Sequence, residues 1–295
     1  MAWRMFRVTY KLLNPLHIGY HKVGNAQRTR YYVPARNLWG GITQQLTRCR
    51  FQSAGVSQRD YAQIGEWVRE HCAFAYFFLR DKDGTFYPQW TEKGLRYGPL
   101  PTPEFERQWL SALVTTALHT SSTPAETGSL HEVEYIAPYR MSYSGKVRLT
   151  KLCGWVLLDE VGLQELGDPT KWNRWLGELQ VGGERRYGFG RLRLSPDGWA
   201  KTQGLLPGYA VHLDGKQPKV TIEEFRAVLA HVPTEGIQGK GLIEPLVGRE
   251  TNTLKSHVFG RRLTRAVMCW APGTVLKSAT RFEITPEGLW SPMEQ

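Results

Sequence analysis

The stretch from Val181 to Arg193 reads Val-Gly-Gly-Glu-Arg-Arg-Tyr-Gly-Phe-Gly-Arg-Leu-Arg, with four glycines and four arginines in thirteen residues. Glycine allows a backbone to adopt positive φ and allows a ligand to approach the main chain closely. Arginine offers a planar set of donors for phosphate, and aromatic rings such as that of Tyr187 offer faces for bases. The stretch therefore indicates a loop that wraps a nucleic-acid backbone. A glycine-rich turn between a helix and a strand, with solvated arginines, fits the same residues.

Two familiar phosphate-binding motifs do not fit this stretch. Gly183 and Gly188 have the spacing of a P-loop, but Phe189 and Gly190 stand where lysine and serine or threonine are needed. A dinucleotide fingerprint would need a third glycine near position 193, which is arginine, and a strand leading into the loop. The sequence before the loop predicts a helix instead, so both motifs are excluded.

The chain of 295 residues is long enough for a substantial core, as one large or two modest domains. No apolar run approaches the ~20 residues that span a bilayer, and the N-terminus lacks the apolar region of a signal peptide. The four cysteines are scattered without a CxxC pair, which indicates neither a zinc site nor a disulfide framework. We therefore expect a cytoplasmic protein with reduced thiols, no membrane contact, no metal and no cofactor.

Net charge is +11 and the isoelectric point is near 9.5, which points to an anionic partner. Residues 1–59 contain ten Lys or Arg and no Asp or Glu, whereas the rest of the chain is nearly balanced. A second basic concentration lies between Arg249 and Arg281, with seven Lys or Arg and one acid. A solvated surface usually mixes signs, so the acid-free segment favours a nucleic-acid surface over an idle basic one.

Hydrophobic periodicity predicts the elements of the chain. Strands are expected over residues 4–13, 130–137, 147–158, 191–194, 209–213, 267–270 and 275–284. Helices are expected over residues 37–48 (with Asn37 as its cap), 61–72, 105–119, 172–179 and 222–231. Asp81–Gly84 is a hairpin signal, and the polar stretch 120–129 predicts an exposed loop or flap.

The order of these elements up to residue 195 is compatible with the β-α-β-β-α-β arrangement of a ferredoxin-like domain. We therefore expect an α+β chain with a ferredoxin-like (RRM-like) domain over residues 1–200, carrying insertions at about 50–130. Residues 201–295 are expected to form a β-rich extension or a second ferredoxin-like half.

Four segments in this order resemble the RAMP superfamily of CRISPR-associated RNA-binding proteins. Pro15–Gly19 is similar to the turn after the first strand of that family, and Tyr32–Ile42 to the entry into its first helix, with Ala35 where glycine is usual. Gly182–Arg191 resembles the signature glycine-rich loop, and Thr127–Glu134 the segment before a central strand. The resemblance extends over about the first two-thirds of the chain and implies a ferredoxin-like RNA-recognition fold.

The resemblance also implies a role. Residues 270–275 and 287–290 are similar to the closing strands of the handle-binding ("Cas five"-like) subunits of type III effectors. It therefore implies a non-catalytic RNA-binding subunit of a type III CRISPR ribonucleoprotein in antiviral defence, which grips the 5′ handle of the crRNA and caps the complex. Its partners would be the crRNA, the large subunit and the adjacent backbone RAMP subunit.

The residues expected to bind RNA are glycines and cations of the loop, Tyr187, and cations of the two basic segments. They are Gly182, Gly183, Arg185, Arg186, Tyr187, Gly188, Gly190, Arg191, His17, Lys22, Arg28, Arg30, Arg36, Arg261 and Arg262. Main-chain N–H groups of the loop would contact phosphates, Tyr187 would stack on a base, and Phe189, between two glycines, is expected to be the more buried aromatic.

Two alternatives stay open. A metal-independent endoribonuclease that processes CRISPR repeats would use His17 and His21 as general acid and base. Metal-dependent cleavage is disfavoured because residues 17–36 contain no acid to hold a metal. The second alternative is a RAMP backbone or assembly subunit whose charge serves complex formation.

Overall fold

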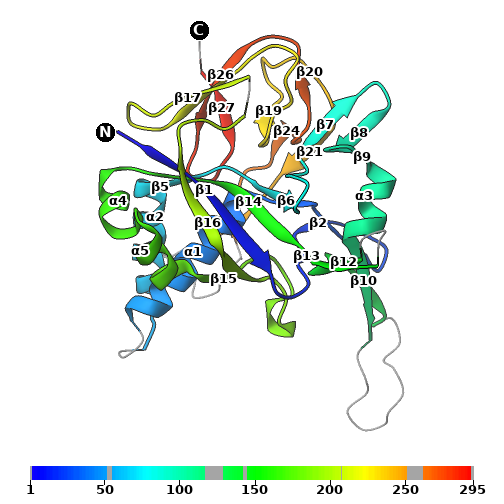
Figure 1. The fold of residues 1–295 in the computed structure, drawn as a ribbon, viewed down its shortest axis with the longest axis horizontal. Coiled ribbons are helices and arrows are strands. Elements are labelled where there is room, and N and C mark those ends of the chain that lie inside the picture. Colours follow the sequence, from blue (N-terminus) through cyan, green and yellow to red (C-terminus); the bar gives the residue numbers. More distant parts are fainter. Residues whose placement is uncertain are drawn as a thin grey trace.

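The computed structural model describes residues 2–51, 55–116, 129–141, 145–206, 208–250 and 262–293. Its central sheet is antiparallel, with the order β15-β16-β1-β14-β6-β4 and with β5 also paired to β14 (Figure 1). The strands are β1 (Arg4–Leu12), β4 (Tyr32–Val33), β5 (Cys72–Phe74), β6 (Phe77–Arg80), β14 (Lys151–Leu158), β15 (Glu178–Gln180) and β16 (Arg191–Thr202). The expected strands at the start of the chain, before residue 158 and after the glycine-rich loop are thus confirmed.

The predicted alternation of the first strand is present in β1. Val8, Tyr10 and Leu12 are buried, whereas Arg7 is exposed and Lys11 is partly exposed. Because successive side chains of a strand point to opposite faces, Val8, Tyr10 and Leu12 lie on one face of the sheet and Arg7 and Lys11 on the other. β1 lies between β14 and β16 and pairs antiparallel with both.

Four helices pack together beside this sheet (Figure 1). They are α1 (Ala35–Arg50), α2 (Gln58–His71), α4 (Glu160–Leu166) and α5 (Pro169–Leu176). Tyr10 shows which face they cover, because its hydroxyl donates to the carbonyl oxygen of Leu176 at 2.8 Å and accepts from the indole of Trp172 at 2.9 Å. The first helix begins at Ala35 after an extended Pro34, so Asn37 is inside the helix and is not its cap.

The chain order through these elements is β1, then α1 and α2, then β5 and β6, then β14, then α4 and α5, and finally β16. With β1 in the middle, β16 on one side, and β14 followed by β5 and β6 on the other, this is the arrangement of a ferredoxin-like domain. The α+β class and the expected fold are therefore confirmed.

A long insertion separates β6 from β14 and projects from the body of the molecule (Figure 1). It holds the sheet of β7 (Pro88–Thr91), β8 (Gly94–Tyr97) and β9 (Leu100–Pro101), the helix α3 (Thr102–Trp109), and the pair β12 (Tyr139–Met141) and β13 (Val147–Leu149). Its β10 (Leu110–Thr115) and β11 (His131–Ile136) join β2 (Gly19–Val23) and β3 (Ala26–Thr29) in a four-stranded sheet.

The predicted helix over 105–119 is therefore only half right. Residues up to Trp109 are helical, but Leu110 begins a strand that pairs antiparallel with β11 over six residues. The flap expected over 120–129 lies outside the described residues, apart from Ser129.

The C-terminal part is rich in strands, as expected. One sheet has the order β17 (Tyr209–His212), β18 (Lys219–Ile222), β26 (Thr280–Ile284) and β27 (Trp290–Pro292). A second has the order β19 (Val232–Pro233), β24 (Val267–Trp270) and β21 (Ile243–Leu246). The C-terminal part also has two two-stranded sheets. One pairs β20 (Gly239–Lys240) with β25 (Val275–Leu276), and the other pairs β22 (Arg249–Glu250) with β23 (Arg262–Leu263).

The helix predicted over 222–231 is wrong. Ile222 ends β18, Phe225 has a φ of 57°, and the amides of Phe225 and Val228 donate to the carbonyl oxygens of Leu276 and Thr274. These partners lie about fifty residues further along the chain, so long-range pairing replaces the local helical bonds here. The apolar spacing that suggested a helix reflects burial of Val228 and Leu229 in the core.

One hydrophobic core runs through both parts of the chain. It includes Val8, Phe74 and Leu157 of the central sheet together with Phe282 and Trp290 of the C-terminal strands. The division near residue 200 accordingly stays a prediction. None of the described helices is both long and apolar enough to cross a membrane.

Candidate RNA-binding surface

The glycine-rich loop closes a hairpin between β15 and β16, in which Gln180 pairs with Arg191. Gly182, Gly188 and Gly190 have φ values of 85°, 85° and 77°, which is the left-handed region that glycine adopts without strain. The helix predicted over 172–179 would lead directly into this loop, but α5 ends at Leu176 and the strand β15 intervenes. Because a strand also follows the loop, it remains unlike a dinucleotide-binding turn, which leads into a helix.

The glycines bring the loop against the turn that follows β1. The amides of Gly183 and Gly190 donate to the carbonyl oxygens of His17 at 2.8 Å and Pro15 at 2.7 Å. A Cβ on Gly182 would lie 2.4 Å from the same oxygen of His17. The close approach that glycine permits is therefore used within the chain. The predicted contact of the Gly183 and Gly190 amides with phosphate is corrected, because these amides already have partners.

The polar side chains of the loop, in contrast, point outward. Arg185, Arg186 and Arg191 are exposed, and Tyr187 is 77% exposed, the largest value among the exposed large hydrophobic side chains described. Phe189 is buried and packs edge-on against Tyr135, as the sequence analysis expected. The loop thus combines a rigid backbone with an exposed aromatic ring and three exposed guanidinium groups.

Arg185 links this loop to α1. Its guanidinium donates to the side-chain oxygen of Gln44, and partial burial together with the charge of Arg48 lowers the pKa of Arg185. Arg48 lies in the last turn of α1 and is exposed. A phosphate placed between these two like charges would be stabilised by both.

The predicted contacts from residues 17–36 divide into exposed and buried groups. Lys22 is exposed on β2, and Arg28 is 44% exposed while it pairs with Glu134 at 3.3 Å. Arg36 is partly buried, and its guanidinium lies against the backbone of Gly248. Lys22 is therefore exposed to a ligand, whereas Arg28 would have to share its guanidinium with Glu134.

His17 does not present its ring to the surface. It is 4% exposed, and its Nδ1 lies 2.7 Å from the carbonyl oxygen of Glu134. The expectation that His17 contacts RNA is therefore corrected, since the fold uses this ring to hold β11 beside the loop. His21, the other candidate for acid–base chemistry, is exposed on β2 and lies edge-on to Tyr20. The two histidines thus sit in different environments.

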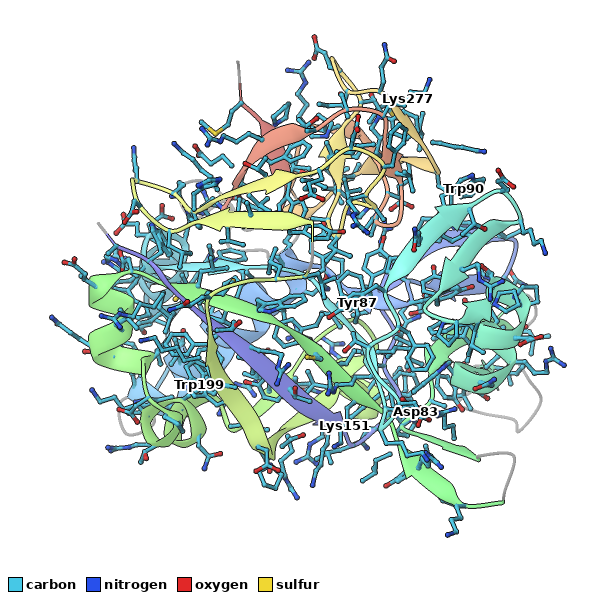
Figure 2. All side chains as sticks on the ribbon, turned by 45° about the horizontal axis from the view of Figure 1, so that its top comes forward. Asp83, Tyr87, Trp90, Lys151, Trp199 and Lys277 are labelled. Carbon is cyan, nitrogen blue, oxygen red and sulfur yellow. The ribbon has the colours of Figure 1, made fainter. Side chains whose placement is uncertain are left out.

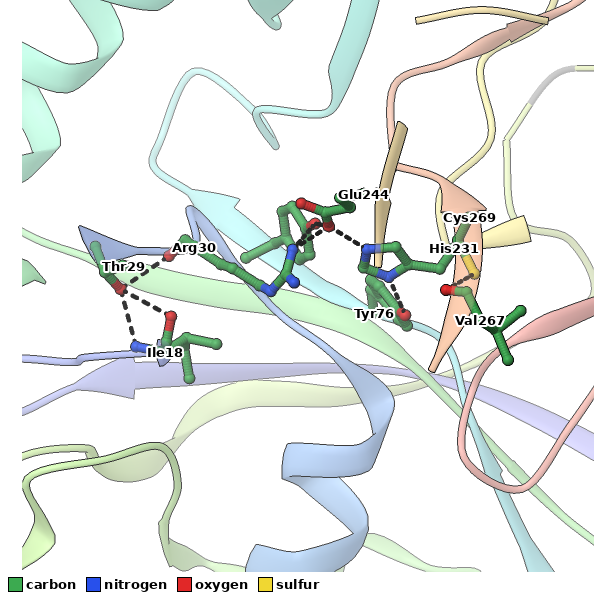
Figure 3. A network of polar contacts seen from close by, with 9 residues as sticks. Ile18, Thr29, Arg30, Tyr76, His231, Glu244, Val267 and Cys269 are labelled. Carbon is green, nitrogen blue, oxygen red and sulfur yellow. Dashed lines mark hydrogen bonds and ion pairs between the residues drawn. The ribbon is translucent and has the colours of Figure 1, made fainter. Parts of the chain in front are cut away.

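Arg30 also has a structural role, which corrects its prediction as an RNA contact. Its guanidinium is 11% exposed, donates to the carboxylate of Glu244 on β21, and lies 3.2 Å from the hydroxyl of Tyr32 (Figure 3). Glu244 also accepts a hydrogen bond from His231, whose other ring nitrogen accepts from the hydroxyl of Tyr76 at 2.6 Å. This chain of contacts joins the N-terminal part to the C-terminal strands.

The charges in this network follow from its burial. Burial alone would raise the pKa of Glu244, but the hydrogen bond from His231 and the charge of Arg30 outweigh it and lower the pKa to about 2. Burial lowers the pKa of His231, which keeps the ring neutral near pH 7. A neutral ring fits the two contacts, with Nε2 donating to the carboxylate and Nδ1 accepting from the phenol.

Sequence reasoning did not find Glu134 or Glu244, the two acids that organise the basic segment. Glu134 holds Arg28, and it also accepts from the amide of Thr29 at 2.9 Å. No local pattern marks either acid, because each meets its partners only after folding. Arg261 lies outside the described residues, and for Arg262 only the backbone in β23 is described, so both remain predictions.

Comparison with known proteins supports the fold. No family model matches the chain, and no curated protein sequence matches it. The structure is similar to a chain of "Type III-B Cmr-beta bound to cognate target RNA and AMPPnP, state 1", with a TM-score of 0.53 and 12% identity over 92% of this chain and 86% of that chain. A chain of Type III-B Cmr-beta bound to cognate target RNA gives a TM-score of 0.53 and 11% identity over the same shares. At such identity the likeness shows a shared fold.

Proposed function

We propose that this chain is a non-catalytic RNA-binding subunit of a type III CRISPR effector complex. It grips the single-stranded 5′ handle of the crRNA and caps one end of the complex, beside the large subunit and a backbone RAMP subunit. The fold likeness to chains of Type III-B Cmr-beta structures bound to target RNA supports the class of complex. The net charge of +11 supports an anionic partner.

The observation that carries the proposal is the exposure of Arg185, Arg186, Tyr187 and Arg191 on a loop whose backbone is fixed from within. Guanidinium groups bind phosphate through charge-assisted hydrogen bonds. A stacked base is worth ~1–3 kcal/mol, and every base has a face that can stack. A fixed loop with these side chains binds RNA with little loss of conformational entropy.

The test is a titration of the full chain with labelled guide RNA, with an intact or a scrambled 5′ handle, at several salt concentrations. Arg185→Gln, Arg186→Gln and Arg191→Gln together should reduce the slope of log affinity against log salt by ~2, since each lost contact with a single strand contributes ~0.7. Lys93→Gln, Arg107→Gln and Lys216→Gln form the matched control, because all three are exposed and lie outside both basic segments.

Two results would contradict the proposal. One is equal affinity of the assembled complex for intact and scrambled handles, and the other is an unchanged salt slope in the loop variant. His21 is exposed in a basic hairpin, where it could act on RNA as a general acid or base, so the endoribonuclease alternative can be tested at this residue. Clean cutting of repeat RNA in EDTA, lost in His21→Ala, would show that the chain is an enzyme.

A further inference from the structure

Four cations from four adjacent strands form a single row across the central sheet. Arg193 on β16 pairs with Lys11 on β1, Lys11 pairs with Lys151 on β14, and Lys151 pairs with Arg80 on β6. Directly paired residues place their side chains on the same face, and neighbouring strands are ~4.8 Å apart. The row is therefore a line of positive charges at regular spacing, drawn from residues that are distant in sequence.

This row lies on the face opposite the helices. Tyr10 and Leu12, which flank Lys11, are buried, and the Tyr10 hydroxyl binds the end of α5. Lys11, Lys151 and Arg80 are partly exposed, and the side chain of Arg193 is 57% exposed. Figure 2 shows Lys151 near the end of β1 and Tyr87 further toward the C-terminal strands.

The row is unfavourable for the isolated chain. Like charges directly opposite one another in a sheet are destabilising, and here three such pairs occur in succession. Glu178 neutralises the outer end, at 2.8 Å from Arg193. Among the described residues, no carboxylate lies within ion-pair distance of Lys11 or Lys151. An external polyanion would relieve this repulsion.

A neighbouring aromatic platform favours a nucleic acid over an acidic protein surface. Tyr87 is partly exposed and stacks on Trp155, with ring centroids 6.1 Å apart and an interplanar angle of 16°. The charges of Arg80 and Arg7 act on this ring and partly oppose the effect of burial, which raises the pKa of Tyr87 to about 12. Cations beside an aromatic platform are typical of single-strand binding surfaces, whereas lysine is depleted at protein interfaces.

The row also continues from the glycine-rich loop. Arg191 ends that loop and stands two residues before Arg193 on the same face of β16. We infer that the row Arg193–Lys11–Lys151–Arg80 is a second phosphate-binding surface, which carries single-stranded RNA from the loop across the end of the sheet where these side chains are accessible. The inference rests on the proposed function, since it extends the path of the same RNA.

The experiment measures binding of a fluorescein-labelled oligouridylate to the full chain by anisotropy, between about 50 and 200 mM salt. Lys11→Gln with Lys151→Gln should reduce the slope of log affinity against log salt by ~1.4, or ~0.7 for each lysine. Lys11→Arg with Lys151→Arg, which keeps both charges, should retain the wild-type slope. Lys93→Gln with Lys216→Gln, which are exposed elsewhere, should also retain it.

Thermal unfolding separates loss of binding from loss of fold. Because the glutamine pair removes a like-charge contact, its melting temperature should be no lower than that of the wild type. If it is lower, the single variant Lys151→Gln replaces the pair, with an expected decrease in slope of ~0.7.

The two proposals can fail separately. In one outcome the slope of log affinity against log salt is unchanged in the lysine variant but reduced in the variant of Arg185, Arg186 and Arg191. This outcome would overturn RNA binding by the row and leave RNA binding by the loop standing. The reverse result would establish the row and overturn the loop as the grip on RNA. Loss of association with other effector subunits at an unchanged RNA slope would assign the row to an acidic protein partner and overturn the inference. Unchanged slopes in both variants would overturn both proposals.

Discussion

Replacing Glu244 by glutamine removes the carboxylate that joins the two parts of the chain while it keeps the shape of the side chain. Glu244 is 8% exposed on its side chain and accepts from Arg30 and from His231. In Glu244→Gln, the guanidinium of Arg30 would stay buried without its counter-charge. Breaking a buried ion pair by removing one partner costs about 3–5 kcal/mol.

The pKa of Glu244 gives an independent value for the free energy of unfolding that is lost in Glu244→Gln. The contacts in the folded state lower it from 4.5 to about 2. Because one pKa unit is worth ~1.4 kcal/mol, the folded state gains ~3 kcal/mol from the charged carboxylate. The two routes agree, so we expect Glu244→Gln to reduce the free energy of unfolding by ~3 kcal/mol near neutral pH.

The pH dependence distinguishes this explanation from a packing defect. A carboxyl with a lowered pKa in the folded state contributes its full stability above its unfolded pKa of about 4.5, and loses it as the pH falls toward 2. The difference between wild type and Glu244→Gln should therefore shrink to ~1.4 kcal/mol at about pH 3. Urea unfolding at about pH 7 and about pH 3, followed by tryptophan fluorescence, measures both values.

Two variants serve as controls. Tyr76→Phe removes the hydroxyl bound to His231 and leaves the carboxylate, so it measures the loss of that hydrogen bond while Arg30 keeps its counter-charge. Glu235→Gln replaces an exposed acid and should stay within ~0.5 kcal/mol of the wild type. The reasoning is refuted if Glu244→Gln costs less than ~1 kcal/mol near pH 7, or if its cost is the same at both pH values.

The remaining predictions concern the glycine-rich loop. Gly190→Ala should lower the melting temperature by far more than Gly188→Ala. Both positions have positive φ, which costs ~1–2 kcal/mol for alanine. Only at Gly190, however, would the new Cβ collide with a backbone oxygen, that of Val181 at 1.8 Å. Equal melting temperatures would contradict this. Tyr187→Ala should leave the free energy of unfolding within ~0.5 kcal/mol, since its ring is exposed, but should weaken RNA binding by ~1–3 kcal/mol. Unchanged RNA affinity would exclude Tyr187 as a stacking platform.

The features of the fold that could be predicted from the sequence are those with a local cause. The alternation along Arg7–Leu12 of β1 follows from a strand with an apolar face, and three of the four glycines of the loop mark positions where φ is positive. The second helix begins where Ser57 and Asp60 form a reciprocal cap, which precedes the amphipathic pattern expected over 61–72.

The errors have a non-local cause. Leu110–Thr115 continues an apolar pattern that suits a helix, but it pairs with residues 131–136 across a long insertion. The segment 222–231 is apolar because it is buried, and its amides bond to residues 274 and 276. The spacing of apolar residues in a sequence indicates which residues are buried, but it does not indicate which segment their backbones pair with.

The candidate site shows the same limit in its charges. The first 59 residues hold ten cations and no acid, so the segment was expected to form a nucleic-acid surface. Folding brings acids from elsewhere, so Glu134 pairs with Arg28, Glu244 with Arg30, and Glu165 with Arg50. Glu244 is 214 residues from Arg30 in sequence, so a charge count along the chain could not distinguish structural cations from those available to a ligand.

The division into cations that are paired with acids and cations that are unpaired indicates where an anionic partner can bind. Arg30 is buried with its own carboxylate and holds the C-terminal strands, so it adds nothing to the surface potential that a ligand meets. Arg7, Lys11 and Lys22 have no carboxylate within ion-pair distance among the residues described. Because unpaired charges on a stable fold gain most from a counter-charge in solution, RNA is expected to follow the unpaired cations, which include Lys11 of the row across the central sheet and Lys22 of β2. The paired cations then determine the position of these strands.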